Sequence, residues 1–89
     1  NDVFPTAMHV AAVLALHHQL QPALHSLIAS LQQRSEAFSA VVKIGRTHMM
    51  DATPLTLGQE FSGYVAQLQL AQATLEQARE DLYELALGG

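Results

Sequence analysis

Five histidines supply most of the groups in this 89-residue chain that could bind a metal or transfer a proton. Three of them, His17, His18 and His25, stand in apolar sequence with helical spacing. His18 and His25 share a helix face but lie two turns, or roughly 10 Å, apart. Zinc sites on helices favour closer pairs, such as i and i+4, and no HExxH occurs. We therefore interpret these three as surface or interface histidines and expect no metal site.

His48 has different neighbours. It follows Arg46 and Thr47 and precedes Asp51, in a stretch that lacks helical periodicity. A histidine in such a loop can bind an anionic group or transfer a proton near neutral pH, and the Thr47 hydroxyl adds a donor. The alternative is a structured turn in which Asp51 and Thr53 bond their own backbone and Arg46 pairs with an acid. The residue types leave both interpretations open.

Asn1 and Asp2 form a second polar group, directly ahead of an apolar segment. An asparagine amide at a helix N-terminus can donate to a carboxylate, because the helix end adds partial positive charge. Asn and Asp are also common helix caps. On residue type alone, capping is favoured.

These groups have to be positioned by helices. An apolar stripe with i, i+3, i+4 spacing predicts a helix over about 5–40, kinked or interrupted near Pro22, which lacks the N–H that would bond His18. The period fails over 41–57, so we expect an irregular loop there, in which 41–44 and 55–57 are short enough for strand-like pieces. Thr56 and Gln59 have the spacing of a capping box and predict a second helix over about 57–87.

The second helix carries a seam of apolar residues seven apart. They are Phe61, Leu68, Leu75 and Leu82. Such a seam is typical of packing against long neighbouring helices, and one helix cannot cover it. We therefore expect an all-α bundle that includes other chains or segments.

Composition excludes several classes of function. The chain has no cysteine, which rules out disulfides and thiolate chemistry, and a net charge of −4, which disfavours nucleic acids and anionic membranes. The longest apolar run, 7–16, is interrupted by His9 and too short to cross a bilayer. The sequence lacks an initial Met and stops just after an amphipathic helix, so we expect an excerpt of a larger protein.

Several motifs resemble those of class II fumarase (fumarate hydratase), within the aspartase/fumarase superfamily. The central stretch reads KIGRTH over 43–48 and DATPLTLGQE over 51–60. The start, NDVFPTAMH, is similar to the family's SSND-x-[FY]-PTAMH segment, and the end, LALGG, to its ELALGGTAVGTG segment. Aspartases read RTQ where this chain has Arg46-Thr47-His48. The chain departs from the family at Met49-Met50, where fumarases usually read Leu-Gln.

The resemblance implies a hydro-lyase that adds water reversibly to fumarate to give L-malate, a reaction of the tricarboxylic acid cycle, without a metal or organic cofactor. His48 would be the catalytic proton donor or acceptor, and Asn1 and Thr47 would bind the dicarboxylate. A serine on a GSSxMPxKxN loop, which these 89 residues lack, is a further candidate for the carbon base. The resemblance also implies the central helical domain of a homotetramer, with sites built from three subunits, in the bacterial cytoplasm or, in eukaryotes, in mitochondria.

Two other functions remain open. The chain can belong to a sister lyase, aspartase-like or argininosuccinate lyase-like, or be a purely structural helical oligomerisation segment. In each case, we expect the isolated 89 residues to self-associate through their apolar seam and to show no fumarate hydration, because the site is incomplete.

Overall fold

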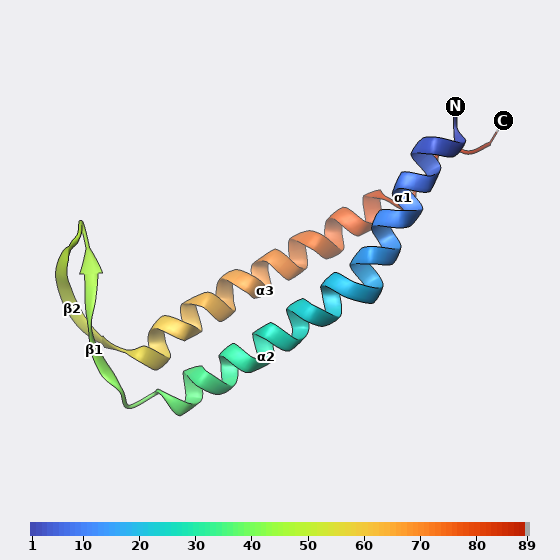
Figure 1. Cartoon of the computed structure of the whole chain (residues 1–89). Coiled ribbons are helices and arrows are strands. Elements are labelled where there is room, and N and C mark those ends of the chain that lie inside the picture. Colours follow the sequence, from blue (N-terminus) through green and yellow to red (C-terminus); the bar gives the residue numbers. More distant parts are fainter. Residues whose placement is uncertain (89) are drawn as a thin grey trace. The chain divides into compact units, whose positions relative to one another are not determined.

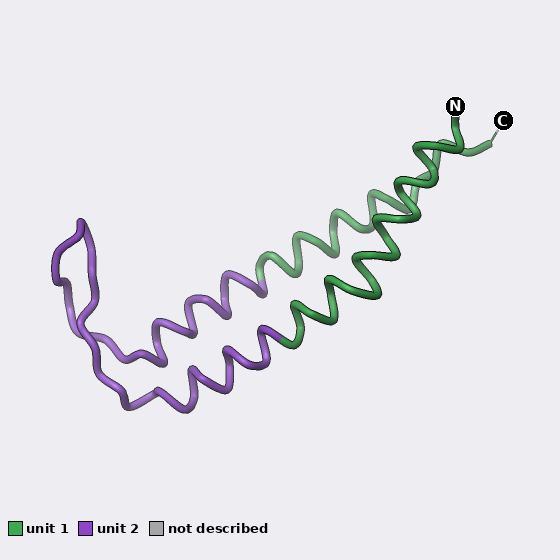
Figure 2. Tube along the Cα trace, viewed as in Figure 1, with its two compact units in different colours: residues 1–26, 70–89 green, residues 27–69 purple. Residues whose placement is uncertain are grey.

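The computed structural model describes residues 1–88, which form helices and one β-hairpin (Figure 1). The elements in chain order are α1 (Val3–Ala15), the π-helical segment η1 (Leu16–Leu20), α2 (Gln21–Ala37), β1 (Val42–Thr47), β2 (Met50–Thr56) and α3 (Leu57–Asp81). The chain divides into two compact units, one made of residues 1–26 with 70–88 and the other of residues 27–69 (Figure 2).

The unit that contains the N-terminus has a π-helical irregularity where the sequence predicts a kink. The five residues of η1 lie directly ahead of Pro22, and the Gln21 N–H bonds the Leu16 carbonyl five residues back. Proline removes one α-helical hydrogen bond and its ring crowds the preceding turn, so a wider turn is the local response. Further along, Arg79 of α3 donates to the Gln21 side chain at 2.7 Å.

The unit of residues 27–69 has a small apolar core between the end of α2 and the start of α3. Ile28 and Val65 are buried, and the Phe38 and Phe61 rings lie 5.8 Å apart between centroids. Gly58 allows the close approach of these segments, because a Cβ there would collide with the backbone carbonyl oxygen of Ser35. Phe61, the first residue of the predicted apolar seam, therefore packs against the end of α2.

The expectation of an all-α fold is confirmed in part: the chain is mostly helical, but residues 42–56 form two paired strands and not an irregular loop. β1 and β2 form an antiparallel hairpin, with Val42 paired to Thr56 at the base and Thr47 paired to Met50 at the tip. The register slips between Ile44 and Arg46, which marks a β-bulge. The signal was missed because the turn has no glycine or asparagine and because β2 contains a proline, which is uncommon within strands.

The helix ends also differ from the prediction. The first helical stretch ends at Ala37 and not near residue 40, and α3 ends at Asp81 and not near residue 87.

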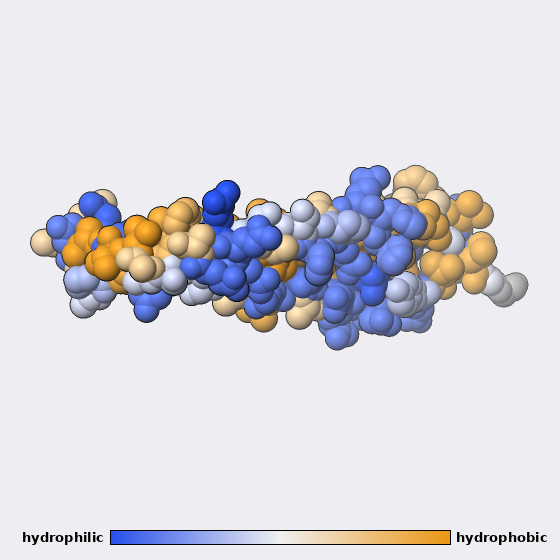
Figure 3. All heavy atoms as spheres, turned by 90° about the horizontal axis from the view of Figure 1, so that it is seen from below, coloured by the Kyte–Doolittle hydropathy of each residue, from blue (hydrophilic) through white to orange (hydrophobic). Residues whose placement is uncertain are grey.

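Apolar colour gathers over the hairpin, at the left of Figure 3. The exposed apolar side chains on the hairpin are Val42, Ile44, Met49 and Met50. A patch of this kind is typical of a surface that contacts another protein segment.

Candidate functional site

Thr47 and His48 lie together at the tip of the hairpin. Thr47 is the last residue of β1, and His48 and Met49 form the two-residue turn that leads to Met50. Both turn residues have positive φ, 53° for His48 and 60° for Met49. Positive φ at both central residues is the signature of a type I′ turn, which usually takes Asn-Gly. For residues with a Cβ this conformation costs about 1–3 kcal/mol each, so the turn holds His48 in a strained and exposed position.

Arg46 contacts the same turn. Its guanidinium Nη2 donates to the Met49 carbonyl oxygen at 3.0 Å. The alternative interpretation of this loop paired Arg46 with an acid, but within residues 1–88 the ion pair that the structure gives joins Lys43 to Glu60. Arg46 therefore bonds a backbone carbonyl of the turn.

A hollow of about 390 Å³ lies beside the hairpin. Its lining is mixed: two cations, a carboxylate and hydroxyl groups stand beside apolar surface, from Lys43, Gly45, Arg46, Thr47, Ala52, Thr53, Leu55 and Glu60. Hydroxyl and guanidinium groups beside one another can bind a carboxylate by charge-assisted hydrogen bonds. Thr47, predicted to bind substrate, thus faces a space where a small anion would find donors.

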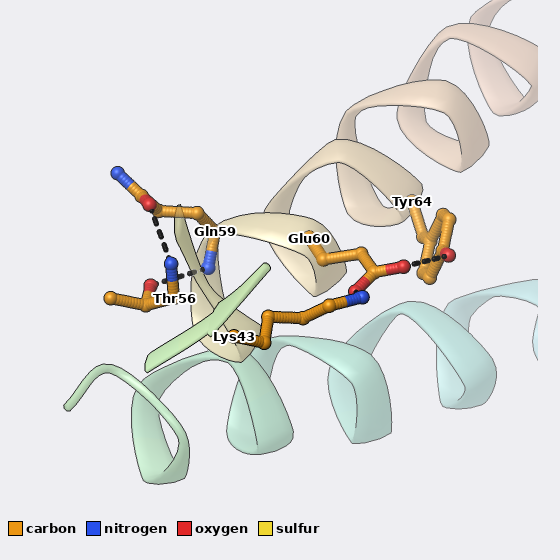
Figure 4. A network of polar contacts seen from close by, with 5 residues as sticks. All are labelled: Lys43, Thr56, Gln59, Glu60 and Tyr64. Carbon is orange, nitrogen blue, oxygen red and sulfur yellow. Dashed lines mark hydrogen bonds and ion pairs between the residues drawn. The ribbon is translucent and has the colours of Figure 1, made fainter. Parts of the chain in front are cut away.

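A polar network fixes the hairpin to the first turns of α3. As Figure 4 shows, Lys43 of β1 reaches the Glu60 carboxylate, to which the Tyr64 hydroxyl also donates at 3.0 Å. The hydrogen bond from Lys43, then that from Tyr64, holds the pKa of Glu60 below its ordinary value. The same bond to the Glu60 carboxylate raises the pKa of Tyr64. This network keeps Glu60 ionised and ties β1 to the helix.

The capping box predicted at the start of α3 is confirmed (Figure 4). The Gln59 N–H donates to the Thr56 hydroxyl at 3.0 Å, and the Thr56 N–H donates to the Gln59 side-chain oxygen at 2.8 Å. Two otherwise free helix N–H groups are satisfied reciprocally. The helix therefore begins at a defined residue, just after β2.

Asn1 belongs to the other unit, so the structure brings Thr47 and His48 together but does not place Asn1 beside them. Asp2 occupies the N-cap position of α1, but in the described chain its side chain makes no capping hydrogen bond, so the capping interpretation is wrong for Asp2. Asn1 is exposed. Its substrate-binding role stays a prediction.

The remaining histidines lie on helices in the N-terminal unit. His17 and His18 are exposed with ring centroids 5.0 Å apart, and His9 bonds the Glu84 carbonyl oxygen through Nδ1 at 3.0 Å. Over residues 1–88, no group of three or more acidic or histidine side chains is arranged to hold a metal ion. Within the same range, no helix combines the length and apolar character needed to cross a bilayer.

The contacts of Arg46, Lys43 and Tyr64 were not predicted from the sequence. The i, i+4 spacing of Glu60 and Tyr64 is a local signal that could have indicated one of them. The Lys43–Glu60 and Arg46–Met49 contacts depend on the hairpin register, which has no comparable signal in the sequence. These two contacts can be inferred only when the pairing of the strands is known.

Comparison with known proteins identifies the family. A family model described as Lyase matches residues 1–89. Proteins named Fumarate hydratase class II are similar over the whole chain. They are 65% identical over 89 residues in Nitrosomonas europaea, and 54% identical over 89 residues in Thermus aquaticus. In both cases 100% of this chain is covered, and the chain spans 19% of the relative's length.

Solved structures agree with this result. A crystal structure of recombinant class II fumarase from Schistosoma mansoni superposes with a TM-score of 0.95 at 43% identity, covering 99% of this chain and 18% of that one. A fumarate lyase:delta crystallin structure from Brucella melitensis in native form gives a TM-score of 0.89 at 45% identity, covering 96% of this chain and 19% of that one. Gly89, the last residue of the resemblance, lies outside the described residues. On these matches, the chain belongs to the lyase family.

Proposed function

We propose that the protein containing this chain is a fumarate hydratase, which adds water reversibly to fumarate to give L-malate. The observation that carries the proposal is the position of His48, exposed at a strained two-residue turn beside Thr47. Identities of 54–65% with proteins named Fumarate hydratase class II support the same reaction. The reaction belongs to the tricarboxylic acid cycle, and bacterial relatives favour the cytoplasm.

The chemistry defines what each residue would do. Hydration adds the hydroxyl of water to one olefinic carbon and a proton to its neighbour. In the reverse direction, a proton leaves the carbon next to a carboxylate, and the negative charge that develops on that carboxylate must be stabilised by aimed donors. His48 would donate or accept a proton, directly or through a water, because its ordinary pKa lies close to neutral pH.

Thr47 and Asn1 would bind the substrate. The Thr47 hydroxyl faces the hollow beside the hairpin, where it would donate a hydrogen bond to one carboxylate of a dicarboxylate. Asn1 would supply an amide donor. We place this chain in the central helical domain of a homotetramer, in which neighbouring subunits would cover its exposed apolar surface and complete the site.

The experiment is an assay of the full-length protein, following the absorbance of the fumarate double bond. We expect His48→Asn to lower turnover by roughly 100-fold or more, the scale for losing a positioned acid–base group. His25→Ala, on an exposed helix face, is the matched control and should leave turnover unchanged. An equal loss in His25→Ala would contradict the assignment of His48.

Two further outcomes separate the alternatives. Release of ammonia from aspartate, or of fumarate from argininosuccinate, with no fumarate hydration, would indicate a sister lyase. A stable oligomer with none of these activities would indicate a structural helical segment. Sedimentation of the same preparation measures the oligomeric state.

A further inference from the structure

We propose that Arg46 is a positioning residue for His48, acting through the backbone of the turn that both flank. The inference rests on the proposed function, because it concerns how the proton-transferring group of that reaction is held.

The turn needs an external contact to stay in place. His48 and Met49 both occupy the left-handed region, which side chains with a Cβ rarely adopt. Neither residue is buried, and Met49 is 90% exposed, so packing of its side chain does not hold the turn. The conformation is therefore maintained by the strand pairing on either side and by contacts to the turn backbone.

Arg46 supplies such a contact. It stands one pair below the tip, opposite Asp51, and its Nη2 donates to the Met49 carbonyl oxygen at 3.0 Å. That carbonyl belongs to the peptide that closes the turn. Bonding it to a side chain of β1 links both ends of the turn and so restricts the backbone of His48, which lies between them.

The bulge and the Lys43–Glu60 ion pair explain why Arg46, and not Lys43, contacts the turn. Gly45 lies at the register slip, and a Cβ there would lie 2.7 Å from the Thr53 carbonyl oxygen, so the strand approaches its partner closely just before Arg46. Bulges commonly re-aim the residue that follows. Lys43, the other cation of β1, is held by Glu60 at the base. Lys43 is therefore engaged at the base, and Arg46 is the cation of β1 that contacts the turn.

The choice of arginine also fits the role. Its planar fork is rigid, so it loses less freedom per hydrogen bond than a lysine would. A lysine at this position could reach the carbonyl with one donor but would fix the turn less well. The same guanidinium lines the hollow beside Thr47, so one side chain would hold the turn and border the substrate space.

The test is a double-mutant cycle in the full-length protein, with fumarate as substrate. We expect Arg46→Ala to lower kcat about tenfold, because the contact is exposed and biases the turn without locking it. Arg46→Lys should recover part of the loss. In a His48→Asn background, Arg46→Ala should change kcat less than twofold, since the group that it positions is already gone.

A second rescue separates positioning from charge. Met49→Gly relieves the strain at the second turn residue, so Arg46→Ala/Met49→Gly should be faster than Arg46→Ala alone. Arg34→Ala, which removes an exposed helical arginine of the same unit, should behave as wild type. Sedimentation of each variant checks that assembly is unchanged.

The outcomes are distinguishable. If His48→Asn is impaired while Arg46→Ala matches wild type, or if the two losses multiply in the double variant, the positioning role is overturned and the proposed function stands. If Arg46→Ala does not assemble, Arg46→Lys and the Met49→Gly rescue decide the matter, and failure of both overturns the role. If wild-type protein does not hydrate fumarate, the proposed function fails and this inference fails with it.

Discussion

At the base of the hairpin several different contacts tie the strands to the helices, whereas at the tip the side-chain contact to the turn is one hydrogen bond from Arg46. The Leu57 N–H bonds the Val41 carbonyl oxygen at 2.7 Å, the Gly58 N–H bonds that of Phe38 at 3.0 Å, and the Ser35 hydroxyl bonds that of Gly58 at 2.8 Å. The base is therefore held redundantly. At the tip, His48, the candidate catalytic residue, has a left-handed backbone conformation that residues with a Cβ rarely adopt.

The difference indicates that, within residues 27–69, the base of the hairpin supports the fold and the tip carries the candidate catalytic group. Loops that carry chemistry are commonly held by a rigid scaffold and are themselves less stable than it. Substitutions at the base should change the stability of the fold, and substitutions at the tip should change turnover more than stability. The following predictions test that division, in order of expected effect on stability.

The largest loss of stability should come from Gly58→Ala. A methyl group there would lie 2.9 Å from the Ser39 Cα and would also collide with the Ser35 carbonyl oxygen. We expect a loss of about 1–3 kcal/mol, the usual result of overpacking a close contact. It can be measured as the shift of the urea midpoint of the full-length protein at fixed protein concentration.

The control is Gly63→Ala, also in α3. Among the described residues, no atom lies within 4 Å of the added methyl group. Alanine in a helix interior should stabilise by roughly 0.5–1 kcal/mol relative to glycine. If both variants lowered the midpoint equally, close approach at Gly58 would not be what holds the base.

The next effect should come from Thr56→Ala, which removes the hydroxyl that caps α3. We expect a loss of about 1 kcal/mol. Thr74→Ala makes the same substitution within α3, where the hydroxyl bonds the Leu70 carbonyl oxygen, and should be neutral or slightly stabilising. Urea midpoints of the two variants compare a cap with a mid-helix position, and a larger loss at Thr74 would contradict the role of the capping box.

At the tip, Met49→Asn should stabilise the protein by less than about 1 kcal/mol. Asparagine adopts positive φ more readily than methionine does, so part of the turn strain is removed. Met50→Asn, one residue along in β2, is the control and should be neutral or unfavourable, because asparagine is disfavoured in strands. Thermal midpoints measure both. A loss of stability in Met49→Asn would show that the turn is not strained.

The smallest effect should be the dependence of stability on the ionisation of Glu60. Because its folded pKa is lowered, the stabilisation is fully present above the ordinary value of 4.5 and is lost as the pH falls through the folded pKa. The network is partly exposed, so the change should be small. Wild-type protein should lose more stability than Glu60→Gln between about pH 6 and about pH 3.5. Glu76→Gln, on the exposed face of α3, should follow wild type.

Features fixed by near neighbours could be predicted from the sequence. The capping box follows from two residues three apart, and the apolar seam from spacing alone, because both depend on the geometry of a single helix. Pro22 indicated an irregularity, since its missing N–H is a property of the residue itself. These signals need no knowledge of distant partners.

Features that depend on pairing could not be predicted. Five residues of β1 pair with β2 across a turn that has no typical turn residues, so neither the pairing nor its register had a local signal. For the site, the motif located Thr47 and His48 but not the contact of Arg46, which exists only because the hairpin brings that side chain back to Met49. Contacts of this kind join residues that the folded hairpin brings together, so they can be identified only once the fold is known.

The π-helical segment η1 has a consequence for the phase of the first helical stretch. Successive residues of an α-helix are rotated by roughly 100°, so one extra residue in a turn shifts every later side chain around the axis by about that angle. The apolar faces of α1 and of the first turn of α2 are therefore offset, and no single 3.6-residue wheel describes both. Deleting one residue within Leu16–Leu20 would restore regular phase and rotate the half-buried Val13 away from its present neighbours.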